Sequence, residues 1–262
     1  RETLIPKPTL IQPDLLIDFE ASPKEINDFL ENKNGSYNGR RQRSDYIETQ
    51  NIVFDILGIS FNSELSNIFE NHFNFALFDN KENKNTYDWL VTIPITEKKK
   101  GMIFLQNYWE EKAIEGINPS SKVYKGVEFI ECKDYRKKQK GSCISTTLIG
   151  QNAIIIASNI NLLKLVIDEK ININRFWNNI DRGLDSTSTK KDRLALISIS
   201  PEKLSSWIGF PENISTINNI ESVSGEVIKK NNYLEMIGLI KFKHPINQSY
   251  TEIASNKYLA ES

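Results

Sequence analysis

Histidine, cysteine and methionine are scarce in this sequence, with two of each among 262 residues. The two histidines, His72 and His244, are too few for a metal site built on several imidazole ligands. The sequence also lacks the H-E-x-x-H, G-x-S-x-G, P-loop and G-x-G-x-x-G patterns that identify common metalloproteases, hydrolases and nucleotide-binding enzymes. These absences do not exclude an enzyme, but they favour a non-catalytic protein without a metal or a cofactor.

An excess of charge and long apolar runs are absent as well. The chain has 33 Lys+Arg and 34 Asp+Glu, and a net charge of −1 argues against nucleic-acid binding, which usually needs a basic domain. The densest apolar run, residues 153–157, is far shorter than the ~18 residues of a membrane span, so we expect no transmembrane segment in this chain. The start at Arg1 rather than Met fits a removed signal or anchor, or simply a fragment boundary.

Alternating apolar residues and turn signals predict a chain rich in strands. Hydrophobic residues make up 39% of the sequence, which is ample for a core, and residues 1–262 are interpreted as a single module. The predicted strands are Leu15–Glu20, His72–Asp79, Tyr87–Thr96, Gly126–Cys132, Ser142–Ile149, Asn152–Ser158, Arg193–Ser200, Ser222–Lys229 and Tyr233–Phe242. Helices are predicted over Glu97–Glu115, after the Ser158/Asn159 cap and in several segments before residue 70. The predicted fold class is α+β, with mostly antiparallel sheets and packed helices.

Two distant segments resemble each other. Leu15–Leu30 and Leu194–Ile208 both contain a strand, a Ser-Pro helix start and a short helix, and each is later followed by a hairpin. This indicates two pseudo-repeated strand–helix–hairpin units, starting near residues 15 and 194. A chance match is the alternative, because Ser-Pro begins many helices.

Ser200 and Lys203 form an S-x-x-K pattern, the remote candidate for catalysis. In serine acyltransferases this spacing places a lysine amine where it can take the proton of the nucleophile. The simpler interpretation is a serine that caps a helix with proline at its first position. Ser22 occupies the corresponding place in the other segment without a matching lysine, which favours capping.

A second alternative is a carrier of a small hydrophobic ligand held between sheet and helices. Its candidate lining is aromatic and sulfur-containing: Trp89, Met102, Trp109, Trp177 and Trp207. Side chains of this kind at helical or strand spacing more often pack the core. A deep apolar pocket would favour the carrier.

Three clusters of basic residues are candidate binding surfaces. Arg40–Arg43, Lys98–Lys100 and Arg136–Lys140 lack interleaved aromatic residues, so base stacking is not predicted. Their default interpretation is solvated surface. The alternative is docking to anionic lipid headgroups or to an acidic partner protein, which salt should weaken.

Several stretches together resemble a known family. They are Phe54–Ser60, Asn74–Asp79, Trp89–Thr96, Gly126–Ile130 and Asn152–Asp168. Their order is similar to an uncharacterised bacterial family, common in cyanobacteria, called domain of unknown function thirty-three fifty-two. The resemblance implies an exported or anchored protein of the periplasm or thylakoid lumen, and it assigns no catalytic residue. Our first hypothesis is thus a non-catalytic extracytoplasmic module that contacts a partner protein or a membrane surface.

Cys132 and Cys143 flank a predicted hairpin. If Phe129 faces Thr146 across this hairpin, the two cysteines lie opposite each other, close enough for a disulfide. Closing this short ring would stabilise the fold by ~3 kcal/mol in the chain-entropy model. The bridge requires an oxidising compartment, and two free thiols are the alternative.

We predict that the Cys132–Cys143 bridge forms. Protein isolated without reductant should have an intact mass two hydrogens lower than the same protein after reduction. Two thiols that react with an alkylating reagent before reduction would contradict the bridge.

Overall fold

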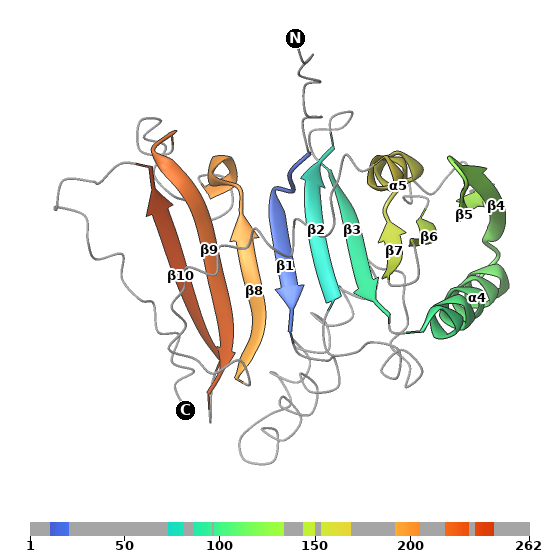
Figure 1. Ribbon diagram of the computed structural model, residues 1–262, viewed down its shortest axis with the longest axis horizontal. Coiled ribbons are helices and arrows are strands. Elements are labelled where there is room, and N and C mark those ends of the chain that lie inside the picture. Colours follow the sequence, from blue (N-terminus) through green and yellow to red (C-terminus); the bar gives the residue numbers. More distant parts are fainter. Residues whose placement is uncertain are drawn as a thin grey trace, which may run out of the picture.

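The computed structural model describes residues 11–20, 73–80, 86–95, 97–133, 144–149, 153–168, 192–204, 218–230 and 234–243. All strands in these ranges belong to one antiparallel sheet, in the order β10-β9-β8-β1-β2-β3-β7-β6-β5-β4 (Figure 1). The strands are β1 (Leu15–Phe19), β2 (Phe73–Asp79), β3 (Tyr87–Pro94), β4 (Asn118–Tyr124), β5 (Val127–Lys133), β6 (Ser145–Ile149), β7 (Ala153–Ala157), β8 (Arg193–Ile199), β9 (Ile220–Lys229) and β10 (Leu234–Phe242). The helices of these ranges are α4 (Lys98–Ile114), α5 (Ile160–Ile167) and the short 3-10 helix η1 (Pro201–Lys203).

The α+β fold class with packed helices is wrong. Within the described ranges a single ten-stranded sheet dominates, accompanied by two α-helices. Local periodicity indicates each hairpin but carries no information on how distant hairpins join, and here they join edge to edge. The strand β4 was not predicted, because its sequence, NPSSKVY, is polar and contains proline.

The pairing of β1 with β8 connects two groups of strands. On one side β1 continues into β2 and β3, and on the other β8 continues into β9 and β10. The strands of the two segments that resemble each other thus lie side by side and antiparallel, with Ile17 opposite Ile197. The helix predicted after β1 lies outside the described residues, so the strand–helix–hairpin repeat stays a prediction.

The predicted hairpins are confirmed. The strand β2 pairs with β3, β6 with β7, and β9 with β10. Pro94 ends β3, as expected of a residue that cannot donate a ladder hydrogen bond, although β3 is an inner strand. The predicted cap of α5 is also confirmed, because the side chain of Asn159 accepts a hydrogen bond from the N–H of Leu162 at 3.0 Å.

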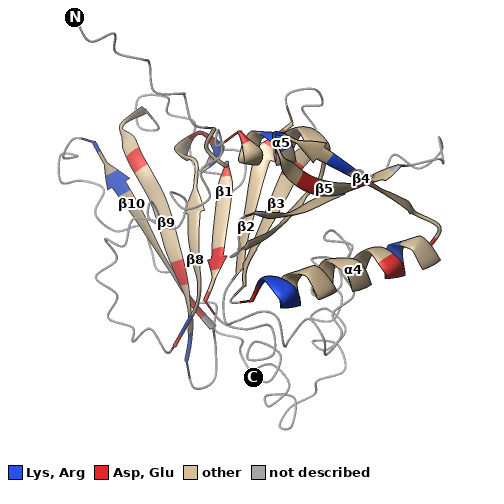
Figure 2. Cartoon of the chain, turned by 45° about the vertical axis from the view of Figure 1, so that its right-hand side comes forward, with Lys and Arg blue, Asp and Glu red and all other residues tan. Residues whose placement is uncertain are grey.

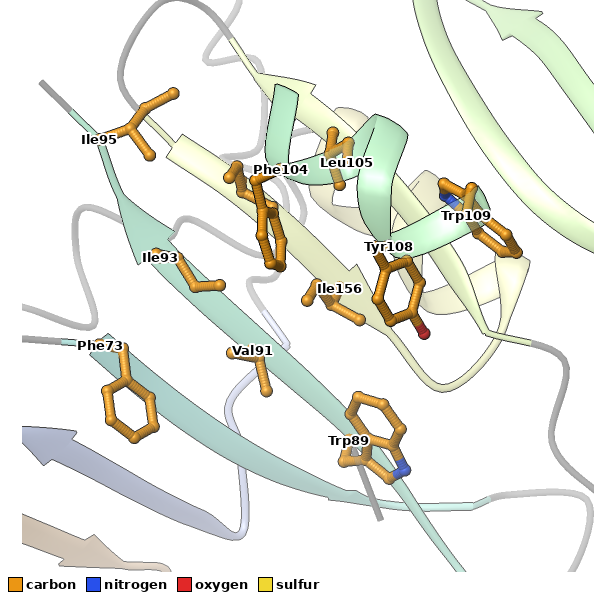
Figure 3. Packing of buried hydrophobic residues seen from close by; sticks show 11 residues of the cluster. Phe73, Trp89, Val91, Ile93, Ile95, Phe104, Leu105, Tyr108, Trp109 and Ile156 are labelled. Carbon is orange, nitrogen blue, oxygen red and sulfur yellow. The ribbon is translucent and has the colours of Figure 1, made fainter. Parts of the chain in front are cut away.

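The core lies on both faces of the sheet. Trp89, Val91 and Ile93 alternate along β3 and pack against α4 on one face, as the alternation predicts (Figure 3). Leu90 points to the other face, where it belongs to the same cluster as Leu163 of α5. Because both faces are covered here, β7 is almost wholly apolar and buried.

The helix α4 begins and ends where the sequence predicts, but its buried side differs. The sequence spacing predicts an apolar stripe through Met102, Leu105, Trp109 and Ala113. The buried residues are Gly101, Phe104, Leu105, Tyr108 and Trp109, whereas Met102 and Ala113 are exposed. Aromatic side chains bury more apolar area than methionine or alanine, so they determine which side faces the sheet.

Gly101 provides a sensitive test of this packing. A Cβ atom there would lie 2.6 Å from Cδ1 of Ile95 and 2.9 Å from Cδ1 of Leu148. We predict that Gly101→Leu lowers the free energy of unfolding by about 1–3 kcal/mol through overpacking, measured by urea denaturation. The exposed Lys99→Leu is the matched control, and an equal loss in both variants would contradict this orientation of α4.

Candidate functional site

The first turns of α4 combine lysines with exposed apolar side chains. Lys98, Lys99 and Lys100 are all exposed. Met102 and Ile103 follow, with exposed fractions of 57% and 48%. Residues three or four apart are neighbours on a helix surface, so Lys98 and Lys99 lie beside Met102 and Ile103. We call these five residues the α4 tip, and Figure 2 shows its basic end in blue.

The charges of α4 oppose the helix dipole. The first turn holds no acidic residue, and the side chain of the N-cap residue Glu97 makes no capping hydrogen bond. A cation near a helix N-terminus costs about 0.3–1 kcal/mol at an exposed site. Lys100 recovers part of this through an ion pair with Glu97 at 3.0 Å. Three successive lysines therefore do not stabilise the helix, and an anionic partner outside the chain would compensate for them.

The rest of α4 fixes the α4 tip to the sheet. Trp109 Nε1 donates a hydrogen bond to Thr146 Oγ1 on β6 at 2.8 Å, and both groups are buried. Phe104, Leu105 and Tyr108 complete the contact with the core. Burial raises the pKa of Tyr108, so its phenol stays protonated. The α4 tip is thus presented on an element anchored by large buried side chains.

The candidate lining of a hydrophobic ligand site is only partly brought together. Trp89 and Trp109 belong to one core cluster, with exposed fractions of 6% and 4%. Met102 lies on the outward side of α4, away from that cluster. Trp177 and Trp207 lie outside the described residues. The carrier stays a prediction, and the two described tryptophans act as core residues.

Ser200 and Lys203 are close in the chain, but Lys203 binds another residue. Its ammonium group forms an ion pair with Asp79 and lies 5.9 Å from the ring centre of Tyr87. Burial opposes its charge, but the hydrogen bond to Asp79 and the carboxylates of Asp14 and Asp79 outweigh burial, so the pKa of Lys203 is raised. A general base needs a lowered pKa, so this geometry does not favour proton abstraction from Ser200.

Ser200 occupies the N-cap position of η1, with proline next, as the capping interpretation predicts. Its side chain, however, makes no capping hydrogen bond. Its backbone makes two hydrogen bonds instead. The N–H of Ser200 donates to the carbonyl oxygen of Asp14 at 2.8 Å, and its carbonyl oxygen accepts from the N–H of Lys203 at 2.9 Å. These bonds connect η1 to the start of β1.

A charged cluster that the sequence reasoning missed lies where β1, β8 and β9 meet. Arg193 donates to both carboxylate oxygens of Glu20, at 2.5 and 2.7 Å. The buried carboxylate of Glu226 lies 3.8 Å from the same guanidinium. The hydrogen bond to Glu20 raises the pKa of Arg193, which stays charged. The available signal was an acidic residue, Glu226, next to Val227 and Ile228 in the interior of the strand Ile220–Lys229.

The cysteine hairpin has a different register from the one assumed. Phe129 faces Thr147 rather than Thr146, a slip of one residue. The N–H of Cys132 accordingly donates to the carbonyl oxygen of Ile144 at 3.3 Å. Cys143 lies outside the described residues, as do His72 and His244, so the bridge stays a prediction.

Two absences among the described residues bear on the class of site. No helix among them is both long and apolar enough to cross a membrane. They also contain no group of three His, Cys, Asp or Glu side chains placed to hold a metal ion.

The described residues define a protein built on a single antiparallel sheet. A model of proteins of unknown function, DUF3352, matches residues 18–261, and the chain belongs to this family. Among solved structures, crystal form I of TP0453 is similar, with a TM-score of 0.45 and 10% sequence identity, over 92% of this chain and 81% of that chain. No curated protein matches the chain.

Asp14 precedes β1 and contacts both Ser200 and Asp79, and its side chain makes the stability of the fold depend on pH. Burial raises the pKa of Asp14, although the N–H of Asp79 and the ammonium of Lys203 favour the carboxylate. In the unfolded chain an aspartate carboxyl has a pKa of about 3.9. In the folded chain Asp14 therefore keeps its proton to a higher pH. Stability conferred by the protonated form is lost as the pH rises through this window.

We predict that Asp14→Asn, which cannot ionise, gains stability relative to the wild type as the pH rises. Urea denaturation of both proteins at about pH 3 and about pH 7 measures the difference on each side of the Asp14 titration. The free energy of unfolding of the variant minus that of the wild type should be larger at the higher pH than at the lower pH. A difference that is unchanged, or that moves the other way, would contradict the raised pKa.

Proposed function

We propose that this chain is a non-catalytic, extracytoplasmic module that contacts an anionic membrane surface through the α4 tip. The observation that carries the proposal is the exposure of Met102 and Ile103 directly beside Lys98, Lys99 and Lys100. Lysines suit phosphate-bearing headgroups, and the apolar side chains suit the boundary with the acyl chains. The cysteine pair, if bridged, supports an oxidising compartment outside the cytoplasm.

The magnitudes favour reversible binding. Each lysine near an anionic membrane surface contributes about 1 kcal/mol. Full burial of an aliphatic side chain contributes about 1.5–3 kcal/mol, and side chains that are already half-covered contribute less. Together the five residues supply several kcal/mol, which suits a peripheral contact that a separate anchor could reinforce.

A lipid surface accounts for the arrangement better than an acidic protein does. Met102 and Ile103 lie near the start of a helix whose opposite side is fixed in the core by Phe104 and Trp109. Such a tip can enter the headgroup region by several ångströms without any change of fold. A stable protein interface would need a larger continuous apolar area around the same lysines.

Vesicle co-sedimentation tests the proposal. Wild-type protein should bind vesicles that contain an anionic lipid, bind neutral vesicles weakly, and dissociate as salt is raised. Replacing Lys98, Lys99 and Lys100 by Gln removes about 3 kcal/mol of attraction and should weaken binding on the order of 100-fold. The double variant Met102→Ser, Ile103→Ser should weaken binding to anionic vesicles while retaining the salt dependence.

The matched control is the double variant Lys122→Gln, Val123→Ser on β4, which also removes an exposed lysine and an exposed apolar residue. It should bind vesicles as the wild type does. Equal binding by wild type and the lysine variant, or an equal loss in the β4 control, would exclude the α4 tip as the contact.

A further inference from the structure

The two edges of the sheet differ in their protection. The edge strand β4 contains Pro119, and its Lys122 forms an ion pair with Glu131 of β5. Proline and lysine on an edge strand discourage pairing with another chain. The other edge strand, β10, spans Leu234–Phe242 without proline and is mostly apolar. Among the described residues no strand pairs with its outer edge.

The side chains of β10 alternate between two faces. Every second residue of a strand points to the same face, so Glu235, Ile237 and Lys241 share one face. Across from them on β9, Glu235 lies opposite Ile228 and Ile237 lies opposite Glu226. Met236 and Ile240 share the other face, and 70% of the Met236 side chain is exposed. Gly238 lies at the middle of the strand.

We propose that two copies of this chain pair antiparallel through β10, about a two-fold axis at Gly238. In that register, residues equally far from Gly238 face each other across the axis. Glu235 of each copy then faces Lys241 of the other, and Met236 faces Ile240 of the other. Opposite charges and apolar pairs directly across a sheet are the favourable combinations.

The central residue of a self-pairing strand faces its own copy, which excludes a charged side chain at that position. Gly238 satisfies this constraint, and the position is open, because a Cβ atom there would meet only Ser224 O, at 3.9 Å. Centring the pair on Ile237 would instead place Glu235 opposite Leu239. The charge pattern of β10 therefore selects Gly238.

The charged residues of β10 already have partners within the chain. Glu235 lies 3.5 Å from Lys230, and Lys241 lies 3.2 Å from Glu221. Antiparallel pairing would add Lys241 of the second copy beside Glu235, so positive and negative groups would alternate across the new strand pair. The exposed Met236 would be covered at the same step.

A mixing experiment tests the proposal in the full chain by sedimentation equilibrium. The wild type should show a concentration-dependent monomer–dimer equilibrium. Glu235→Lys and Lys241→Glu each place like charges opposite each other twice, so each variant alone should dimerise about tenfold or more weakly. An equimolar mixture of the two variants restores both opposite-charge contacts and should form a mixed dimer close to wild-type affinity.

The mixture also controls for folding, because it contains the same two chains that fail to pair alone. Lys122→Glu on the opposite edge strand β4 is the matched control, and it should dimerise as the wild type does. A wild type that stays monomeric at every soluble concentration would overturn the proposal. So would single variants that dimerise normally, or a mixture that fails to pair.

Discussion

The antiparallel pairing of β1 with β8 is the interaction on which the rest of the structure depends. It places Phe19 opposite Ala195 and makes one sheet out of two groups of strands. The bidentate contact of Arg193 with Glu20 reinforces the same junction, and Glu226 adds a carboxylate from the next strand. Leaving a buried charge without a partner costs several kcal/mol, so this cluster disfavours other pairings of these strands.

The junction also determines where surfaces are left for other molecules. Near β3 and β7 the two faces are covered by α4 and α5, and the strands there are apolar on both sides. Among the described residues, the exposed large apolar side chains are Tyr87 on β3, Met102, Ile103 and Ile114 on α4, Val123 on β4 and Met236 on β10. A single exposed apolar residue such as Val123 needs no partner, whereas Met102 and Ile103 are adjacent to each other and to three lysines, which makes the α4 tip the stronger candidate for a contact.

The sequence predicts local elements well and their assembly poorly. The alternation of Trp89, Val91 and Ile93 and the Asn159 cap depend on neighbours in the chain, and both are confirmed. The β1–β8 pairing joins segments far apart in the chain, so no local period encodes it. The one-residue slip at Phe129 has a similar cause, because register depends on the turn and on contacts with other strands. As for the candidate site, the sequence identifies the cluster Lys98–Lys100, but the exposure of Met102 follows from how aromatic residues orient α4.

The positions of the two proposed surfaces make them compatible. The edge strand β10 ends one side of the sheet, whereas α4 packs near the other side (Figure 1). A dimer joined through β10 would therefore leave both α4 tips uncovered. Two weak lipid contacts on one particle act together, because binding of the first raises the effective concentration of the second. If both proposals hold, the β10 edge and the lysine cluster of α4 serve one function, because pairing through β10 would strengthen a membrane contact that a single α4 tip would make only weakly.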